Sequence, residues 1–237
     1  MPTLKEYALS ALGIELTVAQ ARSFDRLTDL LLEWNERMNL TAITDPQDIA
    51  IMHYLDALTL AQAVSDFDQL RLIDVGAGAG FPGLPLAIAF PQLRVTLLDS
   101  RAKKLRFIAQ AGAELGLKNI RVLQARAEDA GRDRRQREAY DIVVARALGR
   151  MPVVAEYTLP LAKTGGQVIA FKGSSAFDEC NAAAHAIDVL GGELFAIEEV
   201  RLPTLDNPRY LIAIDKVKPT PRKYPRKAGL PSRQPLL

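Results

Sequence analysis

Cysteine is nearly absent from this sequence of 237 residues, in which Cys180 is the only one. A single cysteine excludes an internal disulfide and a cysteine-rich zinc cluster, and its helical context predicts an unreactive thiol. No apolar run approaches the roughly 20 residues that a membrane-spanning helix requires, and the first ten residues lack a signal-peptide core. We therefore expect a cytosolic protein with no metal site and no membrane contact.

Charge is present in both signs, but it is distributed unevenly along the chain. The formal net charge is +2, whereas the segment from residue 216 to residue 237 has seven basic residues and no acidic one. The seven are Lys216, Lys218, Arg222, Lys223, Arg226, Lys227 and Arg233. Such an end on a mildly acidic body indicates either a polyanionic partner or a solvated, partly disordered tail. Composition alone leaves both interpretations open.

The first 65 residues have the apolar spacing of helices. Thr17 and Gln20 form a capping-box pattern. One apolar stripe follows at steps of three and four residues, made of Phe24, Leu27, Leu31, Trp34 and Met38. A second helix is predicted to begin at Asp45 and Pro46, because proline is tolerated in the first helical turn. We expect a helical appendage over residues 1–65.

From residue 71 onward, short apolar strands alternate with helical patterns. The predicted strands cover residues 71–75, 94–99, 120–124, 140–145 and 166–172, followed by two more, at 193–202 and 209–217, that form an antiparallel hairpin. This alternation predicts an α/β fold with a mostly parallel sheet over residues 66–217. The basic, proline-rich tail then covers residues 218–237.

A glycine-rich loop, GAGAGFPG, directly follows the first predicted strand. Glycines there permit a tight turn and the close approach of a ligand to the backbone, at the edge where open α/β sheets bind ligands. Gly76, Gly78 and Gly80 match the GxGxG pattern of S-adenosylmethionine sites, whereas Gly78, Gly80 and Gly83 match the GxGxxG pattern of dinucleotide sites. The loop alone therefore indicates only a nucleotide-like cofactor.

Other features favour S-adenosylmethionine over a dinucleotide. Pro82 and Pro85 lie where a pyrophosphate-binding helix should begin, and the terminal hairpin differs from the second half of a dehydrogenase fold. Asp99 ends the second strand, where its carboxylate would accept ribose hydroxyls of either cofactor. Ala127 and Glu128 (or Asp129) follow the third strand and would meet the adenine, unless the acid is simply a surface residue near Arg126. This order of elements resembles the class I methyltransferase fold.

The segment after the fourth strand, DIVVARALGRMP, bears on the methyl acceptor. It lacks the Asn-Pro-Pro type motif of enzymes that methylate exocyclic amines, and Cys180 is not placed to attack a pyrimidine ring. Guanine N7 remains as an acceptor that owns a lone pair, for which positioning suffices and no catalytic base is expected. Arg146 would bind phosphate, guanine or cofactor carboxylate, unless it pairs with Glu128 or Asp141.

Motifs along nearly the whole chain carry a family resemblance. They are LLEWNERMNLTAIT, HYLDAL, LIDVGAGAGFPGLPLAI, LLDSRAKKLRFI, ARAED, DIVVARAL, FKG and TPRKYPRKAGLPSRQPL. Together they resemble the RsmG (GidB) family of bacterial 16S rRNA guanine-N7 methyltransferases. The glycine loop is shared with many methyltransferases, whereas the two terminal segments are the specific ones. The resemblance implies S-adenosylmethionine as donor and methylation of guanine 527, in the 530 loop of 16S rRNA, with free rRNA or the small ribosomal subunit as partner and no DNA.

The resemblance also implies site residues. The cofactor set is Gly76, Phe81, Ala127, Glu128 and Arg146, to which the ribose argument adds Asp99. RNA contacts are expected from Lys172, Arg222, Lys223, Arg226 and Lys227, with Tyr224 stacking on an unpaired base. Asn39 and His53 would touch the substrate, or they would serve only as capping and core residues, with His53 and Asp56 simply paired on the helix.

The alternatives are an NAD(P)-dependent oxidoreductase and a module that binds rRNA without catalysis.

Overall fold

The sheet has seven strands, and their order places the glycine loop at its centre. The computed structural model describes residues 2–237. The strands are β1 (Arg71–Val75), β2 (Arg94–Asp99), β3 (Ile120–Gln124), β4 (Tyr140–Arg146), β5 (Ala162–Lys172), β6 (Gly192–Val200) and β7 (Arg209–Lys216). Their order is β3-β2-β1-β4-β5-β7-β6, with β1 to β5 parallel and β7 antiparallel to both neighbours. The predicted fold and its terminal hairpin are thereby confirmed.

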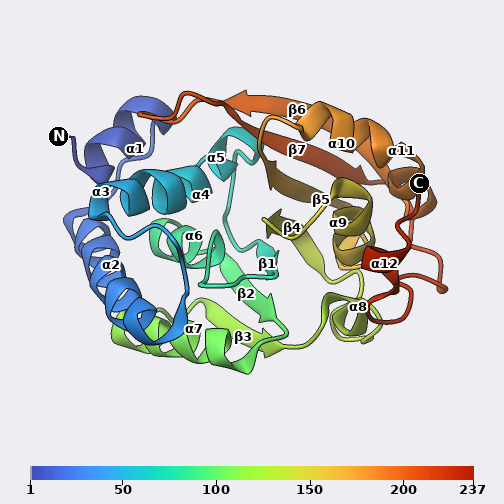
Figure 1. Cartoon of the computed structure of the whole chain (residues 1–237), viewed down its shortest axis with the longest axis horizontal. Coiled ribbons are helices and arrows are strands. Elements are labelled where there is room, and N and C mark those ends of the chain that lie inside the picture. The colour runs from blue at the N-terminus through green and yellow to red at the C-terminus, as the bar shows by residue number, and fades with distance from the viewer. Residues whose placement is uncertain (1) are drawn as a thin grey trace.

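The strands are apolar on both faces because helices cover both. Along β4, Ile142 and Val144 enter one core cluster, whereas Val143 and Ala145 enter the other. The first face is covered by the N-terminal helices with α6 (Gly83–Ala89) and α7 (Ala102–Glu114), and the second by α8 (Ala127–Ala130), α9 (Met151–Thr158), α10 (Ala176–Ala182), α11 (Ala184–Val189) and α12 (Leu230–Arg233) (Figure 1). Such double coverage is the usual environment of a parallel sheet.

The N-terminal helices are α1 (Leu4–Leu12), α2 (Val18–Met38), α3 (Pro46–Ile49), the π-helical segment η1 (Ala50–Leu55), α4 (Asp56–Leu58) and α5 (Leu60–Ala63). Both predicted starts are confirmed. Thr17 and Gln20 form the capping box of α2, and Asp45 caps α3 with Pro46 in its first turn. The side chain of Asp45 accepts the backbone N–H groups of Gln47 and Asp48.

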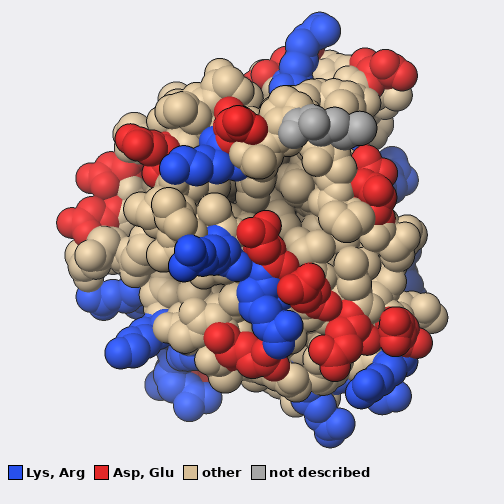
Figure 2. All heavy atoms as spheres, turned by 90° about the vertical axis from the view of Figure 1, so that its left-hand side faces the viewer, with Lys and Arg blue, Asp and Glu red and all other residues tan. Residues whose placement is uncertain are grey.

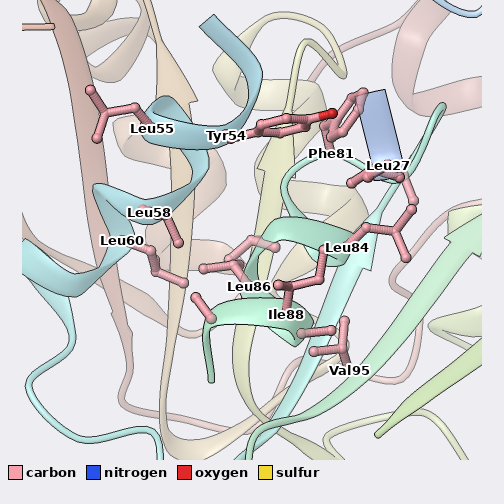
Figure 3. Close-up of a cluster of buried hydrophobic side chains, with 14 of the residues drawn as sticks. Leu27, Tyr54, Leu55, Leu58, Leu60, Phe81, Leu84, Leu86, Ile88 and Val95 are labelled. Atoms are coloured by element: carbon pink, nitrogen blue, oxygen red, sulfur yellow. The ribbon is translucent and has the colours of Figure 1, made fainter. Parts of the chain in front are cut away.

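These helices share one apolar core with the sheet domain. Figure 3 shows Leu27 and Leu58 from the N-terminal helices on the side of Leu84 and Leu86 of α6, and Tyr54 directed toward Phe81 of the glycine loop. All six side chains are at most 6% exposed. Among the described residues, the helices before residue 65 and the sheet domain after it therefore share a single hydrophobic core cluster.

The helical segment that carries Cys180 is divided into α10 and α11 at Ala183. The strands agree with their predicted bounds to within two residues, except for β5. Strand β5 begins at Ala162, because Tyr140 pairs with Ala162 before a bulge shifts the pairing to Ile142 and Gln167. Gly165, with φ of +81°, supplies the backbone conformation that this bulge requires. Within residues 2–237, no helix is both long and apolar enough to cross a membrane.

Candidate cofactor and RNA site

The glycine loop is wrapped around the end of β2 by backbone hydrogen bonds. The N–H groups of Gly76 and Ala77 donate to the Leu98 carbonyl at 2.8 and 2.9 Å. Gly76, Gly78 and Gly80 have φ values of +74°, +60° and +88°, so each occupies backbone space that favours glycine. The GxGxG pattern therefore marks the three positions at which the chain needs this freedom.

Helix α6 is poorly suited to hold a pyrophosphate. Its first N–H, that of Gly83, already donates to the Asp74 carboxylate at 2.9 Å. A side chain at Gly83 would lie 2.8 Å from Leu97 and 3.0 Å from Asp74, so this glycine serves close packing. A dinucleotide fingerprint needs free helix N–H groups directed at the ligand. The GxGxxG match thus reflects helix–strand packing.

A cavity of about 280 Å³ lies at the carboxyl ends of the first strands. Its walls include Gly76, Asp99, Ala127 and Glu128, which the structure brings together from separate elements. Asp99 also fixes the loop, because its carboxylate accepts the N–H groups of Gly78 at 3.0 Å and Arg101 at 2.8 Å. A glycine wall with two carboxylates as hydroxyl and amine acceptors fits the adenosyl part of S-adenosylmethionine.

Arg146 lies outside this cavity and binds the N-terminal helices. Its Nη1 donates to the Asp56 carboxylate at 2.9 Å and to the Met52 carbonyl at 3.1 Å. Its guanidinium also lies 5.5 Å from the ring centre of Phe81, within the range of cation–π attraction. The alternative prediction, in which Arg146 pairs with Glu128 or Asp141, is therefore wrong.

Asp141 and Glu128 have other partners. Asp141 accepts the backbone N–H of Arg71 at 2.7 Å and pairs with Lys163. Glu128 is 3% exposed and accepts the backbone N–H of Gly229 at 2.7 Å. Glu128 is thus a buried carboxylate at a cavity wall, and its interpretation as a surface acid is wrong.

His53 is a buried, neutral imidazole whose hydrogen bonds fix its tautomer. Arg146 can only donate, so Nδ1 of His53 accepts from its Nη2 at 3.3 Å, and Nε2–H donates to the Thr41 hydroxyl at 2.9 Å. The ring stacks on Phe81 with centroids 4.6 Å apart. Burial, together with the Arg146 charge, lowers the pKa of His53 to about 4. The expected pairing of His53 with Asp56 is wrong, because both bind Arg146.

Asn39 ends α2 and lies on the surface. It adopts a left-handed conformation with φ of 36° and ψ of 58°, as the C-cap of the helix. The neighbouring Asn35 holds the following loop, since its side-chain oxygen accepts the N–H groups of Leu40 at 2.6 Å and Thr41 at 2.9 Å. Asn35 thus positions the loop that carries Thr41, the hydrogen-bond partner of His53.

Two further cavities continue from the first along the sheet edge. One, of about 200 Å³, is lined by Gly76, Phe81 and Arg146 and shares Gly76 and Lys104 with the first cavity. The next, of about 380 Å³, shares Arg146 with it and adds Lys172 and Arg209. Within residues 2–237, Lys172 pairs with Glu179 at 2.6 Å, whereas no ion pair of Arg209 with an acidic side chain is found.

Asp74 lies fully buried beneath the loop. Its Oδ2 accepts the Gly83 N–H, whereas its Oδ1 has no hydrogen-bond partner among the described residues. Burial raises the pKa of Asp74 to about 7, and the Gly83 hydrogen bond opposes this only in part. Asp74 is therefore a carboxyl group that stays partly protonated at neutral pH.

The basic tail packs against α8 and α9 and does not extend into solvent as a whole. Tyr224 is buried and Arg226 pairs with Glu156, whereas Arg222, Lys223 and Lys227 are exposed. The tail lies on the side of the molecule opposite the N-terminal helices (Figure 1). On the helical side, Figure 2 shows basic and acidic side chains interspersed, without a patch of one sign. Exposed cations of the tail are therefore the better candidates for phosphate contacts.

Two residues of this region, and the role of a third, escaped the sequence-based predictions. Lys104 lines the first two cavities from the first turn of α7, and Arg209 lines the third from the start of β7. Asp56 is the ion-pair partner of Arg146. The position of Lys104 just after the second strand is a signal in the sequence. The position of Arg209 beside Lys172 could not be predicted, because it depends on the strand register in which Tyr210 pairs with Lys172.

The family comparison agrees with this architecture. A family model described as GidB, rRNA small subunit methyltransferase G, matches residues 20–205. The "Ribosomal RNA small subunit methyltransferase G" of Lactobacillus johnsonii is 44% identical over 237 residues, covering 99% of each chain. A protein of the same name from a Geobacillus species is 47% identical over 224 residues, covering 94% of each chain.

The fold comparison points to methyltransferases as well. A mutant form of the 16S rRNA (adenine(1408)-N(1))-methyltransferase from Catenulisporales acidiphilia matches with a TM-score of 0.55 and 18% identity, over 68% of this chain and 90% of that one. At this identity the match supports the class I methyltransferase fold alone. Family model and full-length relatives together lead to the conclusion that this chain belongs to the rRNA small subunit methyltransferase G family.

Proposed function

We propose that this rRNA methyltransferase transfers the methyl group of S-adenosylmethionine to N7 of a guanine in 16S rRNA, guanine 527 of the 530 loop. The observation that carries the proposal is the row of three adjacent cavities, each of which shares lining residues with the next. The first combines a glycine wall with Asp99 and Glu128, and the third combines Arg146, Lys172 and Arg209. The position in the 530 loop rests on the family resemblance.

The first cavity would hold the cofactor. Gly76 permits close approach to the backbone, Asp99 would accept ribose hydroxyls, and Glu128 with Ala127 would border the adenine. The bound cofactor supplies an electrophilic methyl group on a sulfonium. Phe81 lines the adjoining cavity, where it would border the methyl group, and the stacked ring of His53 holds it in place.

The third cavity would hold the target guanine and its phosphate. Three cations line this cavity, and among the described residues Arg209 is the one that forms no ion pair with an acidic side chain. Its charge is therefore available for a phosphate contact. Three of the five N–H groups of Arg146 donate to Asp56, Met52 and His53. The other two remain available to a ligand. Arg146 would therefore orient the ligand from a fixed position.

Guanine N7 needs no proton removed, so the chain needs no catalytic base. Positioning of N7 in line with the methyl group would supply most of the acceleration. Methylation leaves a positive charge on the guanine, which uncompensated cations would oppose. Two of the three cations beside the third cavity are neutralised, because Arg146 pairs with Asp56 and Lys172 with Glu179, and the substrate phosphate would neutralise Arg209. This pairing suits a product that becomes cationic.

RNA outside the cavity would be held by phosphate contacts from Arg222, Lys223 and Lys227. Each is exposed on the C-terminal tail, and Lys172 would contact the target nucleotide at the third cavity. Tyr224 is buried and Arg226 is paired with Glu156, so we propose no RNA contact for these two residues.

A methylation assay tests the proposal. The protein is incubated with radiolabelled S-adenosylmethionine and with free 16S rRNA, assembly intermediates or mature small subunits lacking the modification. Nuclease digestion should release label as N7-methylguanosine from one site, guanine 527. Label in another base or at another guanine would overturn the proposal, as would the absence of label in every substrate form. Stabilisation by NADH and none by S-adenosylmethionine would indicate the oxidoreductase instead.

A further inference from the structure

The C-terminal segment, residues 220–233, packs against Glu128, one of the residues that line the first cavity. Its backbone carbonyls accept hydrogen bonds from the charged loop before β4. Arg132 donates to the Pro225 carbonyl at 2.8 Å, and Arg137 donates to those of Tyr224 at 2.8 Å and Thr220 at 2.6 Å. The Tyr224 ring enters the core on the α9 face of the sheet. The segment therefore has a fixed path over α8 and α9.

One buried ion pair sets the register of this path. Glu156 on α9 has no exposed surface, and Arg226 contacts both of its carboxylate oxygens. Arg226 Nη2 donates to Oε2 at 2.6 Å, Nε donates to Oε1 at 2.9 Å, and the Arg226 backbone N–H donates to Oε1 at 2.7 Å. A planar guanidinium that meets a buried carboxylate in this fork tolerates little displacement.

Three residues farther along, the same segment contacts Glu128, which lines the first cavity. The Gly229 backbone N–H donates to Oε1 of Glu128 at 2.7 Å. Gly229 has a φ of +79°, a backbone conformation that side chains disfavour. Glu128 lines the first cavity beside Ala127 and Tyr157, and burial together with the Glu128 charge raises the pKa of Tyr157. One oxygen of a cofactor-site carboxylate is thus held by the C-terminal segment.

We propose that Arg226 is a positioning residue of the cofactor site. Its ion pair with Glu156 fixes the segment so that the Gly229 N–H orients the Glu128 carboxylate toward S-adenosylmethionine. The inference rests on the proposed role of Glu128 as a cofactor ligand. It assigns Arg226 to cofactor binding, whereas its neighbours Arg222, Lys223 and Lys227 remain free for RNA.

The experiment measures the Kd of S-adenosylmethionine by calorimetry in the absence of RNA. Arg226→Ala should weaken binding about tenfold, the size expected when a hydrogen bond to a charged group is lost. At saturating cofactor, kcat should change less than the Kd. Arg135→Ala is the matched control, because Arg135 forms an arginine–carboxylate pair with Asp133 that is exposed. This control should leave the Kd unchanged.

A double-mutant cycle with Glu128→Ala shows whether Arg226 acts through Glu128. Arg226→Ala should add little to the loss of affinity in a Glu128→Ala background, because the oriented carboxylate is already absent. Equal losses in both backgrounds would overturn the proposal. So would a raised KM for RNA together with an unchanged Kd for the cofactor, the result expected if Arg226 binds phosphate.

Two further measurements keep the outcome clear. If Arg226→Ala fails to fold by circular dichroism, Arg226→Lys replaces it in the same cycle, since lysine keeps the charge and loses the fork. An unchanged Kd in Glu128→Ala alone would overturn the inference at its base. Methylation at guanine N7 is measured separately in each variant, so the proposed function stands or fails on the identity of the product and not on these affinities.

Discussion

Arg146 on β4 and Asp56 on α4 form an ion pair at 2.9 Å that joins the sheet edge to the N-terminal helices. The two residues are 90 positions apart in the sequence, and their side chains are 17% and 8% exposed. The same guanidinium reaches His53 and lies over Phe81. The helices therefore take part in the site and do not merely cover the sheet.

Removal of Arg146 should lower the free energy of unfolding by more than the loss of an exposed ion pair does. Arg146→Met leaves the Asp56 carboxylate buried without its partner, and we expect a loss of about 3–5 kcal/mol in the free energy of unfolding. Denaturant unfolding measures the loss. Combining Arg146→Met with Asp56→Leu should recover part of it, because no charge then remains unpaired. A loss that is the same with and without Asp56 would show that the pair is not coupled.

The His53 imidazole should make stability depend on pH in a mildly acidic range. Its pKa falls from 6.5 to about 4 on folding, so the unfolded chain binds more protons between these values. The contribution of His53 to the free energy of unfolding should therefore rise by up to about 3 kcal/mol as pH increases through this range, then stay level. His53→Gln should remove most of this rise. NMR titration checks the assignment directly, with the exposed His185 as the second imidazole of the chain.

Asp74 should have the opposite effect near neutral pH. Its raised pKa means that the folded protein holds a proton between about pH 4 and pH 7 that the unfolded chain has released. Stability contributed by this group is therefore lost as the pH rises toward 7. Asp74→Asn keeps an oxygen for the Gly83 N–H and cannot ionise. The variant should gain stability relative to the native protein between about pH 5 and pH 8, as followed by denaturant unfolding.

Glycine at position 80 should be needed for both conformation and space. A Cβ there would lie 2.5 Å from the Leu84 side chain at a φ of +88°, whereas Gly116 has a φ of +65° and no atom within 4 Å. Gly116→Ala should cost roughly 1 kcal/mol, the strain of the backbone alone. Gly80→Ala should cost more and also weaken S-adenosylmethionine binding. Equal losses in thermal unfolding would show that Leu84 relaxes without cost.

The exposed cations of the tail should determine the salt dependence of RNA binding. Each phosphate contact with single-stranded RNA contributes about 0.7 to the slope of log K against log salt concentration. The variant Arg222→Ala/Lys223→Ala should reduce this slope by about 1.4, because two such contacts are lost. The control Arg22→Ala/Arg37→Ala removes two cations from α2, where charges of both signs are mixed. Equal changes in the two variants would argue against the tail as the RNA-binding surface.

Features that depend on near neighbours in the chain were predictable. The capping box of α2, the start of α3 and the five parallel strands follow from spacing and residue type over a few positions. The positive φ angles of Gly76, Gly78 and Gly80 follow for the same reason, since a tight turn after a strand requires them. The family resemblance added the cofactor and the class of substrate.

The sequence by itself determined the α/β fold, the position of the glycine loop and the residues that gather at the strand ends, because local patterning and strand order decide these. Only the tertiary structure decided the partners of the charged groups. Arg146 binds Asp56 from a distant helix, and Arg226 binds Glu156, 70 residues away. Ion pairs between remote elements depend on how helices pack on the sheet, and side-chain type alone does not encode that geometry. The same packing places Gly229 against Glu128, a residue that lines the first cavity.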